Sequence, residues 1–100
     1  MRFVSLTPST RKNKRFKIEF SDPKKIIHFG QRGGNTYIDH QDELKRENYL
    51  KRHLVNEDWS VVNPGSLSAF LLWGPSSDLK INLKSYFIKY NIHYDNNIFN

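Results

Sequence analysis

Three side chains capable of acid–base or metal chemistry lie near the middle of the chain: Asp39, His40 and His53. Aspartate and histidine are a common pair of metal ligands, and histidine exchanges a proton near neutral pH. The two histidines are 13 positions apart. On one helix this spacing separates them by about 20 Å, so a single ion cannot bind both. We therefore expect no metal site, no cofactor and no enzymatic activity.

A small nuclease is the enzyme class that a basic chain of this size most readily suggests, and it needs a carboxylate-rich metal site. Asp39, Asp42 and Glu43 form the sole acidic cluster that fits this need. Acidic residues at this position also cap a helix and interact favourably with its positive N-terminus. Helix capping explains the cluster, so the sequence gives no separate support for a nuclease.

The distribution of charge suggests another kind of chemistry, the attraction of phosphate groups. The formal net charge is +6. Residues 1–38 contain nine Lys or Arg and two acidic residues, whereas residues 39–60 contain four basic and six acidic residues. A positive pole of this kind favours nucleic acid, through Coulomb attraction and release of counterions. The simpler alternative is a basic segment that only keeps the protein in solution.

The expected nucleic-acid-binding residues belong to a basic arm, a hairpin and one face of a helix. On the helix, a tyrosine would stack on a base while two cations hold phosphates. The alternative for the helix is a set of exposed cations that form ordinary salt bridges. The candidate residues are Arg11, Lys12, Lys14, Arg15, Lys17, Lys24, Lys25, Arg32, Lys45, Tyr49 and Arg52.

The segment Gly30-Gln31-Arg32-Gly33-Gly34 has two interpretations. Successive backbone amides in a glycine-rich loop can cradle an anion. This segment lacks the lysine and serine or threonine of a phosphate-binding loop, and we do not expect it to open a helix. A plain hairpin turn between two strands is therefore the favoured interpretation.

A small α+β domain is expected to position these residues. Alternation of apolar and charged residues, and runs of β-branched and aromatic residues, predict a three-stranded antiparallel meander. Helical spacing of apolar residues predicts three helices after it, the last of which packs a Leu/Tyr/Phe stripe on the sheet. The strands are expected over residues 16–20, 25–29 and 35–38, and the helices over about 40–55, 66–73 and 76–91.

The chain is expected to divide into a flexible basic arm over residues 1–15, one α+β domain over 16–91 and a loosely ordered tail over 92–100. The absence of cysteine excludes disulfides and thiol chemistry. The longest apolar stretch, Ala69–Trp73, is too short to span a bilayer, so no membrane association is expected. Trp59 and Trp73 are assigned to the core, with interface anchors as the alternative.

The words HFGQRGGNTYIDH, KRENYLKRH, VNEDW and SAFLLWG lie between His28 and Gly74. They resemble those of a family of short basic proteins encoded by nucleocytoplasmic large DNA viruses, which include giant viruses and algal viruses. The resemblance assigns no catalytic role to any position. It implies a viral product carried in the virion, present in the host cytoplasm or viral factory during infection.

We therefore expect a non-enzymatic, virion-associated basic protein that binds nucleic acid without sequence specificity and aids genome packaging or condensation. Double-stranded DNA and other virion proteins are the expected partners. The alternative is a structural or assembly protein of the particle that acts through protein–protein contacts. In that case pairing of an edge strand would give a homodimer. The sequence leaves both functions open.

Overall fold

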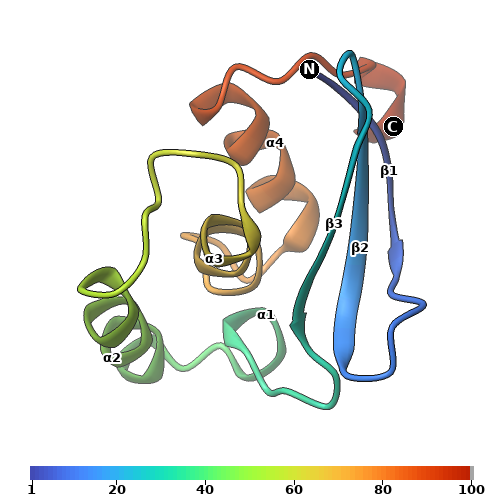
Figure 1. The fold of residues 1–100 in the computed structure, drawn as a ribbon. Coiled ribbons are helices and arrows are strands. Elements are labelled where there is room, and N and C mark those ends of the chain that lie inside the picture. The colour runs from blue at the N-terminus through green and yellow to red at the C-terminus, as the bar shows by residue number, and fades with distance from the viewer. Residues whose placement is uncertain (100) are drawn as a thin grey trace.

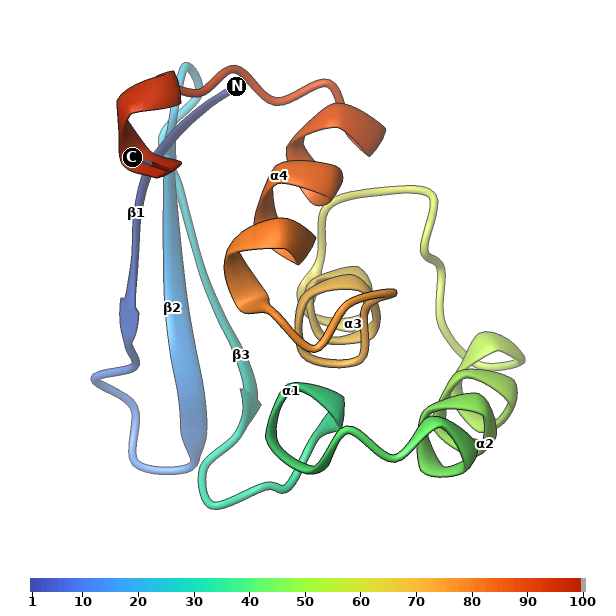
Figure 2. The same ribbon diagram turned by 180° about the vertical axis from the view of Figure 1, so that it is seen from behind.

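The computed structural model describes residues 1–99, which form two layers (Figures 1 and 2). A three-stranded antiparallel sheet with the strand order β1-β2-β3 makes one layer. The labelled helices, α1 to α4, lie together on one side of this sheet in both views. The predicted α+β class, a meander followed by helices, is confirmed.

The central strand β2 (Lys14–Ser21) pairs with β3 (Lys25–Gln31) in a hairpin that contains the first two predicted strands. Alternate residues of β2 face the helices, and Ile18 and Phe20 on this face are fully buried. Ile18 pairs with Ile27 of β3. The apolar alternation of β2 therefore places one face of the hairpin in the core.

The third strand, β1 (Arg2–Pro8), comes from the segment that was expected to be a flexible arm. It pairs antiparallel with β2, and the register shifts between Phe3 and Ser5. This irregularity lets both Phe3 and Leu6 pack against the core, which hides the regular alternation of a strand in the sequence. The prediction of a flexible arm over residues 1–15 is wrong: the segment contains the edge strand β1, a turn and the first two residues of β2.

The strand predicted over residues 35–38 is also wrong, because the chain starts a helix there. Helix α1 (Tyr37–His40) begins with a capping box in which Thr36 and Asp39 satisfy each other's backbone amides. Gln41 then adopts a left-handed conformation with φ of 59°, which ends α1. Asp42 caps the following helix α2 (Glu43–Leu54). The predicted helix over residues 40–55 is therefore preceded by a separate turn of helix.

Two further helical segments complete the layer. Helix α3 (Pro64–Leu67) continues as a π-helix, η1 (Ser68–Leu72), where the Trp73 amide reaches back to the Ser68 carbonyl at 3.0 Å. Helix α4 (Leu79–Lys89) packs on the sheet, with the rings of Phe87 and Phe3 at 4.8 Å. The core joins both layers and includes Ile18, Phe20, Phe29, Leu67, Leu71, Leu72, Leu83, Tyr86 and Phe87.

The segment after α4 is held more firmly than the predicted loose tail. Ile92 is buried, and the His93 carbonyl and amide bond to Phe3 and Met1 of the β1 end, at 2.8 and 3.1 Å. A short 3₁₀ helix, η2 (Asn96–Phe99), follows. Residue 100 of the predicted tail lies outside the described residues. The tail prediction is therefore wrong for residues 92–99.

Both tryptophans lie at the margin of the core. Trp73 is half-buried and packs against the core, and Trp59 is half-buried beside Phe70. Neither is a fully enclosed core residue. Within residues 1–99, no helix has the length and apolar character needed to cross a membrane.

Candidate functional site

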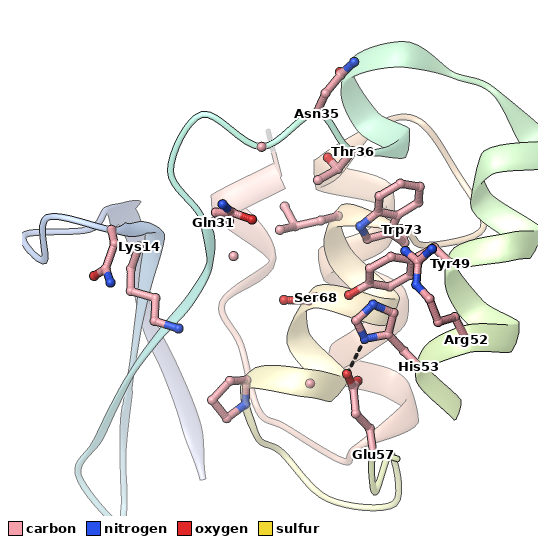
Figure 3. Close-up of a pocket in the computed structure, with 16 residues that line it drawn as sticks. Lys14, Gln31, Asn35, Thr36, Tyr49, Arg52, His53, Glu57, Ser68 and Trp73 are labelled. Atoms are coloured by element: carbon pink, nitrogen blue, oxygen red, sulfur yellow. Dashed lines mark hydrogen bonds and ion pairs between the residues drawn. The ribbon is translucent and has the colours of Figure 1, made fainter. Parts of the chain in front are cut away.

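An open cavity of about 700 Å³ lies between the sheet and α2 (Figure 3). The ends of β2 and β3 and the glycine loop form one wall, and α2 with Glu57 forms the other. The start of α3 and η1 provides the remaining lining. The cavity is therefore built where the two layers separate, at the end of the sheet that carries the β1–β2 turn (Figure 1).

The strand wall presents Lys14 and Gln31, which are paired in the β2–β3 register. Lys14 has the same parity as Ile18, so its side chain points toward the helical layer. Gly30 belongs to the same wall and has a φ angle of +75°. A Cβ atom added there would lie 2.9 Å from Leu72 Cδ1. Glycine is needed at this position for both its backbone conformation and the close approach of η1.

The glycine loop does not make the predicted hairpin turn. The Gly34 amide donates to the Gln31 carbonyl at 2.9 Å, and Gly33 has φ of +78°. The chain then passes through Asn35 into the cap of α1. The loop does contain a turn, but it joins a strand to a helix and not two strands, and it lines the cavity.

The α2 wall is held by a stack of three rings. Tyr49 stacks on His53 with centroids at 4.0 Å and on Trp73 at 4.2 Å. Helix α2 buries no residue fully, so this stack and the Arg46 bonds to the Trp73 and Gly74 carbonyls attach it to η1. Both faces of Tyr49 are covered. A base therefore cannot stack on Tyr49 as predicted, because neither face of the ring is free.

The hydroxyl of Tyr49 remains at the edge of the stack, on the cavity side (Figure 3). Burial, together with the nearby Glu57 carboxylate, raises the pKa of Tyr49 to about 12. The group is thus a neutral phenol at physiological pH. It can donate one hydrogen bond and accept others.

His53 is oriented by Glu57, four residues further along the chain. His53 Nδ1 lies 2.5 Å from Glu57 Oε2, while Glu57 Oε1 accepts a hydrogen bond from Trp59 Nε1 at 2.8 Å. Gly65 leaves room for the carboxylate, because an added Cβ would lie 2.8 Å from Oε1. The ring orientation of His53 is therefore fixed, and Nε2 is the nitrogen left without the carboxylate.

Asp39, His40 and His53 do not form one site. Asp39 accepts two hydrogen bonds from Arg15, at 2.8 Å each, whereas His40 Nδ1 accepts from the Asp42 amide at 2.9 Å. The Arg15 hydrogen bonds hold the pKa of the Asp39 carboxyl well below its usual range. Across residues 1–99, no group of three or more His, Asp or Glu is placed to hold a metal ion.

Three of the predicted nucleic-acid-binding residues line the cavity: Lys14, Tyr49 and Arg52. Lys14 and Arg52 line it from opposite walls, and neither side chain forms a hydrogen bond or ion pair within the described residues (Figure 3). Arg52 also lines a neighbouring hollow of about 340 Å³ with Lys45. Arg11 and Lys12 are exposed in the β1–β2 turn at the same end of the sheet. We call Arg11, Lys12, Lys14, Lys45 and Arg52 the basic rim.

Two predicted arginines have internal roles. Arg15 binds Asp39 and Thr36 and so ties β2 to α1. Arg32 donates from one guanidinium nitrogen to the Ser9 and Arg11 carbonyls, at 2.9 Å each. Because these groups hold together the turns beside the cavity, we assign them to structure and not to ligand contact.

The remaining predicted lysines lie away from the cavity. Lys17 pairs with His28 across β2 and β3. Desolvation lowers the pKa of His28, and the nearby charges of Arg11, Lys17 and Lys14 add to the effect. Lys24 and Lys25 lie at the opposite end of the hairpin, where Lys25 Nζ reaches the Val62 carbonyl at 3.4 Å. The structure therefore does not bring all the predicted cations onto one surface.

Sequence reasoning missed several cavity residues. Ser68 and Glu57 were not singled out, although the spacing of Glu57 from His53 is the i,i+4 spacing of a helical acid–histidine pair. Gln31 was considered only through its backbone, as part of the glycine loop. Ser68 and Gln31 carry no such signal. They are found only when the strand end and η1 are placed next to each other.

The fold and site define a small two-layer α+β protein with an open, cation-lined cavity at one end of its sheet. Residues 4–53 match the model of a family described as a family of unknown function, DUF5754. The chain belongs to this family. The matched region includes the whole strand wall and most of α2, whereas Glu57, Ser68 and Trp73 follow it. Comparisons with curated proteins and with solved structures found no match.

Proposed function

We propose that this protein binds nucleic acid without sequence specificity through the basic rim. The observation that carries the proposal is the placement of Lys14 and Arg52 on opposite walls of one open cavity, with no carboxylate of residues 1–99 bound to either. Cations without an internal partner can replace the counterions of a phosphate backbone. The other three rim residues add positive charge nearby, because Lys45 lines the adjoining hollow and Arg11 and Lys12 are exposed in the β1–β2 turn.

The neighbouring carboxylates do not neutralise the rim through direct pairing. Asp39 is bound by Arg15, Glu57 by His53, and Asp42 accepts from the first amides of α2. Each of these acidic groups has a structural partner of its own. Contacts from lysine and arginine to phosphate would give affinity without reading bases, which agrees with a function independent of sequence.

A pair of matched double variants tests the proposal. Lys14→Ala/Arg52→Ala and Lys24→Ala/Lys25→Ala each remove two positive charges, the first at the cavity and the second at the far end of the hairpin. Binding to a labelled duplex of random sequence is measured by fluorescence anisotropy across a salt series. The cavity variant should lose about tenfold or more in affinity and lower the salt slope by about 2. The far-end variant should change affinity by less than about threefold.

Two results would overturn the proposal. Equal losses in both variants would mean that net charge alone determines binding. Absence of binding by the unmodified protein at low salt would remove nucleic acid as the partner. Deleting residues 1–15 is a poor substitute for these variants, because the deletion removes β1 from the sheet.

Genome packaging or condensation inside a virus particle is the biological setting that we propose for this binding. The support is the resemblance of the segment between His28 and Gly74 to basic proteins of large DNA viruses. In that setting the protein would act in the virion and, during infection, in the viral factory. The DNA of the virus would be its partner in that setting, and no catalytic step would be required.

A structural role through self-association is the second candidate function. Ile81 and Ile88 lie seven residues apart on α4 and expose 54% and 68% of their surface. Residues at this spacing share one helix face, and exposed apolar residues of this kind favour a protein contact. Sedimentation of the protein and of Ile81→Ser/Ile88→Ser tests this role: a dimer that the variant loses supports it, and a monomeric parent protein contradicts it.

A further inference from the structure

The volume of the cavity is larger than contact with a phosphate backbone requires, because such contact needs only surface cations. At about 700 Å³, the cavity has the volume of a small-molecule site. Lys14 and Arg52 both line it, so a ligand inside it lies near the same cations that would hold phosphates. The interior must therefore accommodate a different part of the ligand.

Four neutral polar groups along the cavity have no protein partner. The side-chain amides of Asn13 and Gln31 and the hydroxyls of Tyr49 and Ser68 form no hydrogen bond within the described residues. Figure 3 shows Gln31 on the strand wall and Tyr49 on the α2 wall, with Ser68 between them. Amides and hydroxyls both donate and accept, so together they match an uncharged ligand edge that carries donors and acceptors in any order.

The rest of the lining is apolar or small. Leu72, Pro64 and Gly65 line the cavity beside the edge of Trp73. Leu72 is almost fully buried, with 1% of its surface exposed. Apolar lining next to mixed donors and acceptors corresponds to the two aspects of a nucleobase, its ring and its hydrogen-bonding edge.

We propose that the cavity binds one unpaired nucleotide, with the base inside and its phosphates between Lys14 and Arg52. This inference rests on the proposed function and names the form of nucleic acid that the site takes. A base in a duplex is stacked and its edge is paired, so only a single-stranded or frayed segment can supply the ligand. Because amides and hydroxyls both donate and accept hydrogen bonds, they can pair with the edge of any base. This agrees with binding that is independent of sequence.

A variant that fills the cavity without changing charge separates this inference from the proposed function. Ser68 is half-buried in the continuous helix of α3 and η1, with helical backbone angles, so leucine can replace it and occupy the base site. Ser85→Leu on the exposed surface of α4 is the matched control. Affinity is measured by fluorescence anisotropy for a labelled single strand of mixed sequence and for the corresponding duplex.

The unmodified protein and Ser85→Leu should bind the single strand about tenfold more tightly than the duplex, the size of effect that one or two net hydrogen bonds to a base supply. Ser68→Leu should lose this preference and keep its affinity for the duplex. Asn13→Ala/Gln31→Ala provides a second variant in case leucine at position 68 prevents folding, and it should reduce the preference several-fold.

Equal affinity of the unmodified protein for both forms, or a preference that survives in a folded cavity variant, would overturn this inference and leave the proposed function intact. Absence of binding to either form at low salt would overturn both. Competition by adenosine 5′-monophosphate adds a direct readout. It should displace the single strand from the unmodified protein but not from Asn13→Ala/Gln31→Ala, and displacement from both would contradict the base site.

Discussion

Polar side chains are used in opposite ways in two regions of this small protein. In the helical layer, Asn82 is fully buried and its amide bonds to the Leu71 carbonyl and to both the carbonyl and the amide of Ser76, at 2.9, 2.7 and 3.0 Å. In the cavity, the amides of Asn13 and Gln31 form no bond of this kind within residues 1–99.

The difference indicates which polar groups hold the fold and which are available to a ligand. Buried polar groups without partners are costly, so most polar groups in a protein interior are hydrogen-bonded. Polar groups at an open cavity remain hydrated and carry no such cost. Substitutions in the two regions should therefore separate, with stability affected in the first and binding in the second.

The largest expected effect is the loss of stability in Asn82→Ala. The substitution removes three hydrogen bonds and leaves the Leu71 and Ser76 backbone groups without their partner, which should cost about 3 kcal/mol. Urea denaturation measures the change, with exposed Asn56→Ala as the control. A variant whose unfolding free energy stays within about 0.5 kcal/mol of the parent would contradict the structural role of this network.

The ion pair between Arg15 and Asp39 lies between the two regions and should have an intermediate effect. Asp39→Asn should lower the free energy of unfolding at pH 7 by about 1–2 kcal/mol, since it weakens a bidentate pair and a helix cap. The folded-state pKa of Asp39 is below its unfolded value of about 3.9. Its stabilisation is therefore fully present above that value and is lost as pH falls toward the folded pKa.

Urea midpoints measured from pH 7 down to about pH 3 test this linkage. The difference between the parent protein and Asp39→Asn should narrow as the pH falls. Asp22→Asn, in the exposed β2–β3 turn, controls for the general effect of one lost carboxylate. A difference that stays constant with pH would show that the pair contributes no proton-linked stability.

A smaller loss is expected for the buried hydroxyl of Tyr86, which lies 2.8 Å from the Ser66 hydroxyl. Burial raises the pKa of Tyr86 well above its usual range, so the group is a neutral hydrogen-bonding partner. Tyr86→Phe should cost about 1 kcal/mol by urea denaturation. Tyr94→Phe, whose hydroxyl makes no hydrogen bond within the described residues, should be close to neutral. Equal losses of unfolding free energy in the two variants would show that the hydrogen bond to Ser66 does not stabilise the fold.

The smallest expected effect on stability belongs to the cavity cations. Lys14→Ala/Arg52→Ala should unfold within about 0.5 kcal/mol of the parent, because neither side chain forms an ion pair in the described structure. Thermal and urea unfolding both check this. A loss comparable to that of Asn82→Ala would mean that the two cations hold the fold and are not reserved for a ligand.

The sequence predicted the fold class because the strongest local signals agreed with the global arrangement. The alternation of Phe16, Ile18 and Phe20 located β2, and the spacing of Leu83, Tyr86 and Phe87 located the buried face of α4. Both signals arise from residues whose burial follows a regular period. The sheet and its covering helix could therefore be anticipated.

The errors occurred where a tertiary contact overrides the local pattern. Strand β1 was missed because its register shift interrupts the alternation between Phe3 and Leu6. The start of α1 was taken for a strand because the capping role of Asp39 depends on Thr36 and on Arg15 from β2. A contact with a residue more than twenty positions away leaves no periodic signal in the sequence.

The candidate site was predictable only in part, for a related reason. The charge of Lys14, Lys45 and Arg52 is visible in the sequence, but whether a cation is free depends on its partners in the fold. In the sequence, Arg15 and Arg32 could not be distinguished from Lys14 as free cations. In the fold, both arginines bind other groups of the protein. The ring stack that covers Tyr49 needs Trp73, which lies 24 positions further along the chain.

Mapping of backbone amide signals tests the central claim, that nucleic acid binds at the cavity end of the sheet, most directly. The ¹⁵N-labelled protein is titrated with a single-stranded oligonucleotide of mixed sequence, and chemical-shift changes are followed at each residue. We expect the largest chemical-shift changes at Lys14, Gln31 and Arg52, and none at Lys24 and Lys25. Changes centred on the β2–β3 turn, or no changes at all, would contradict it.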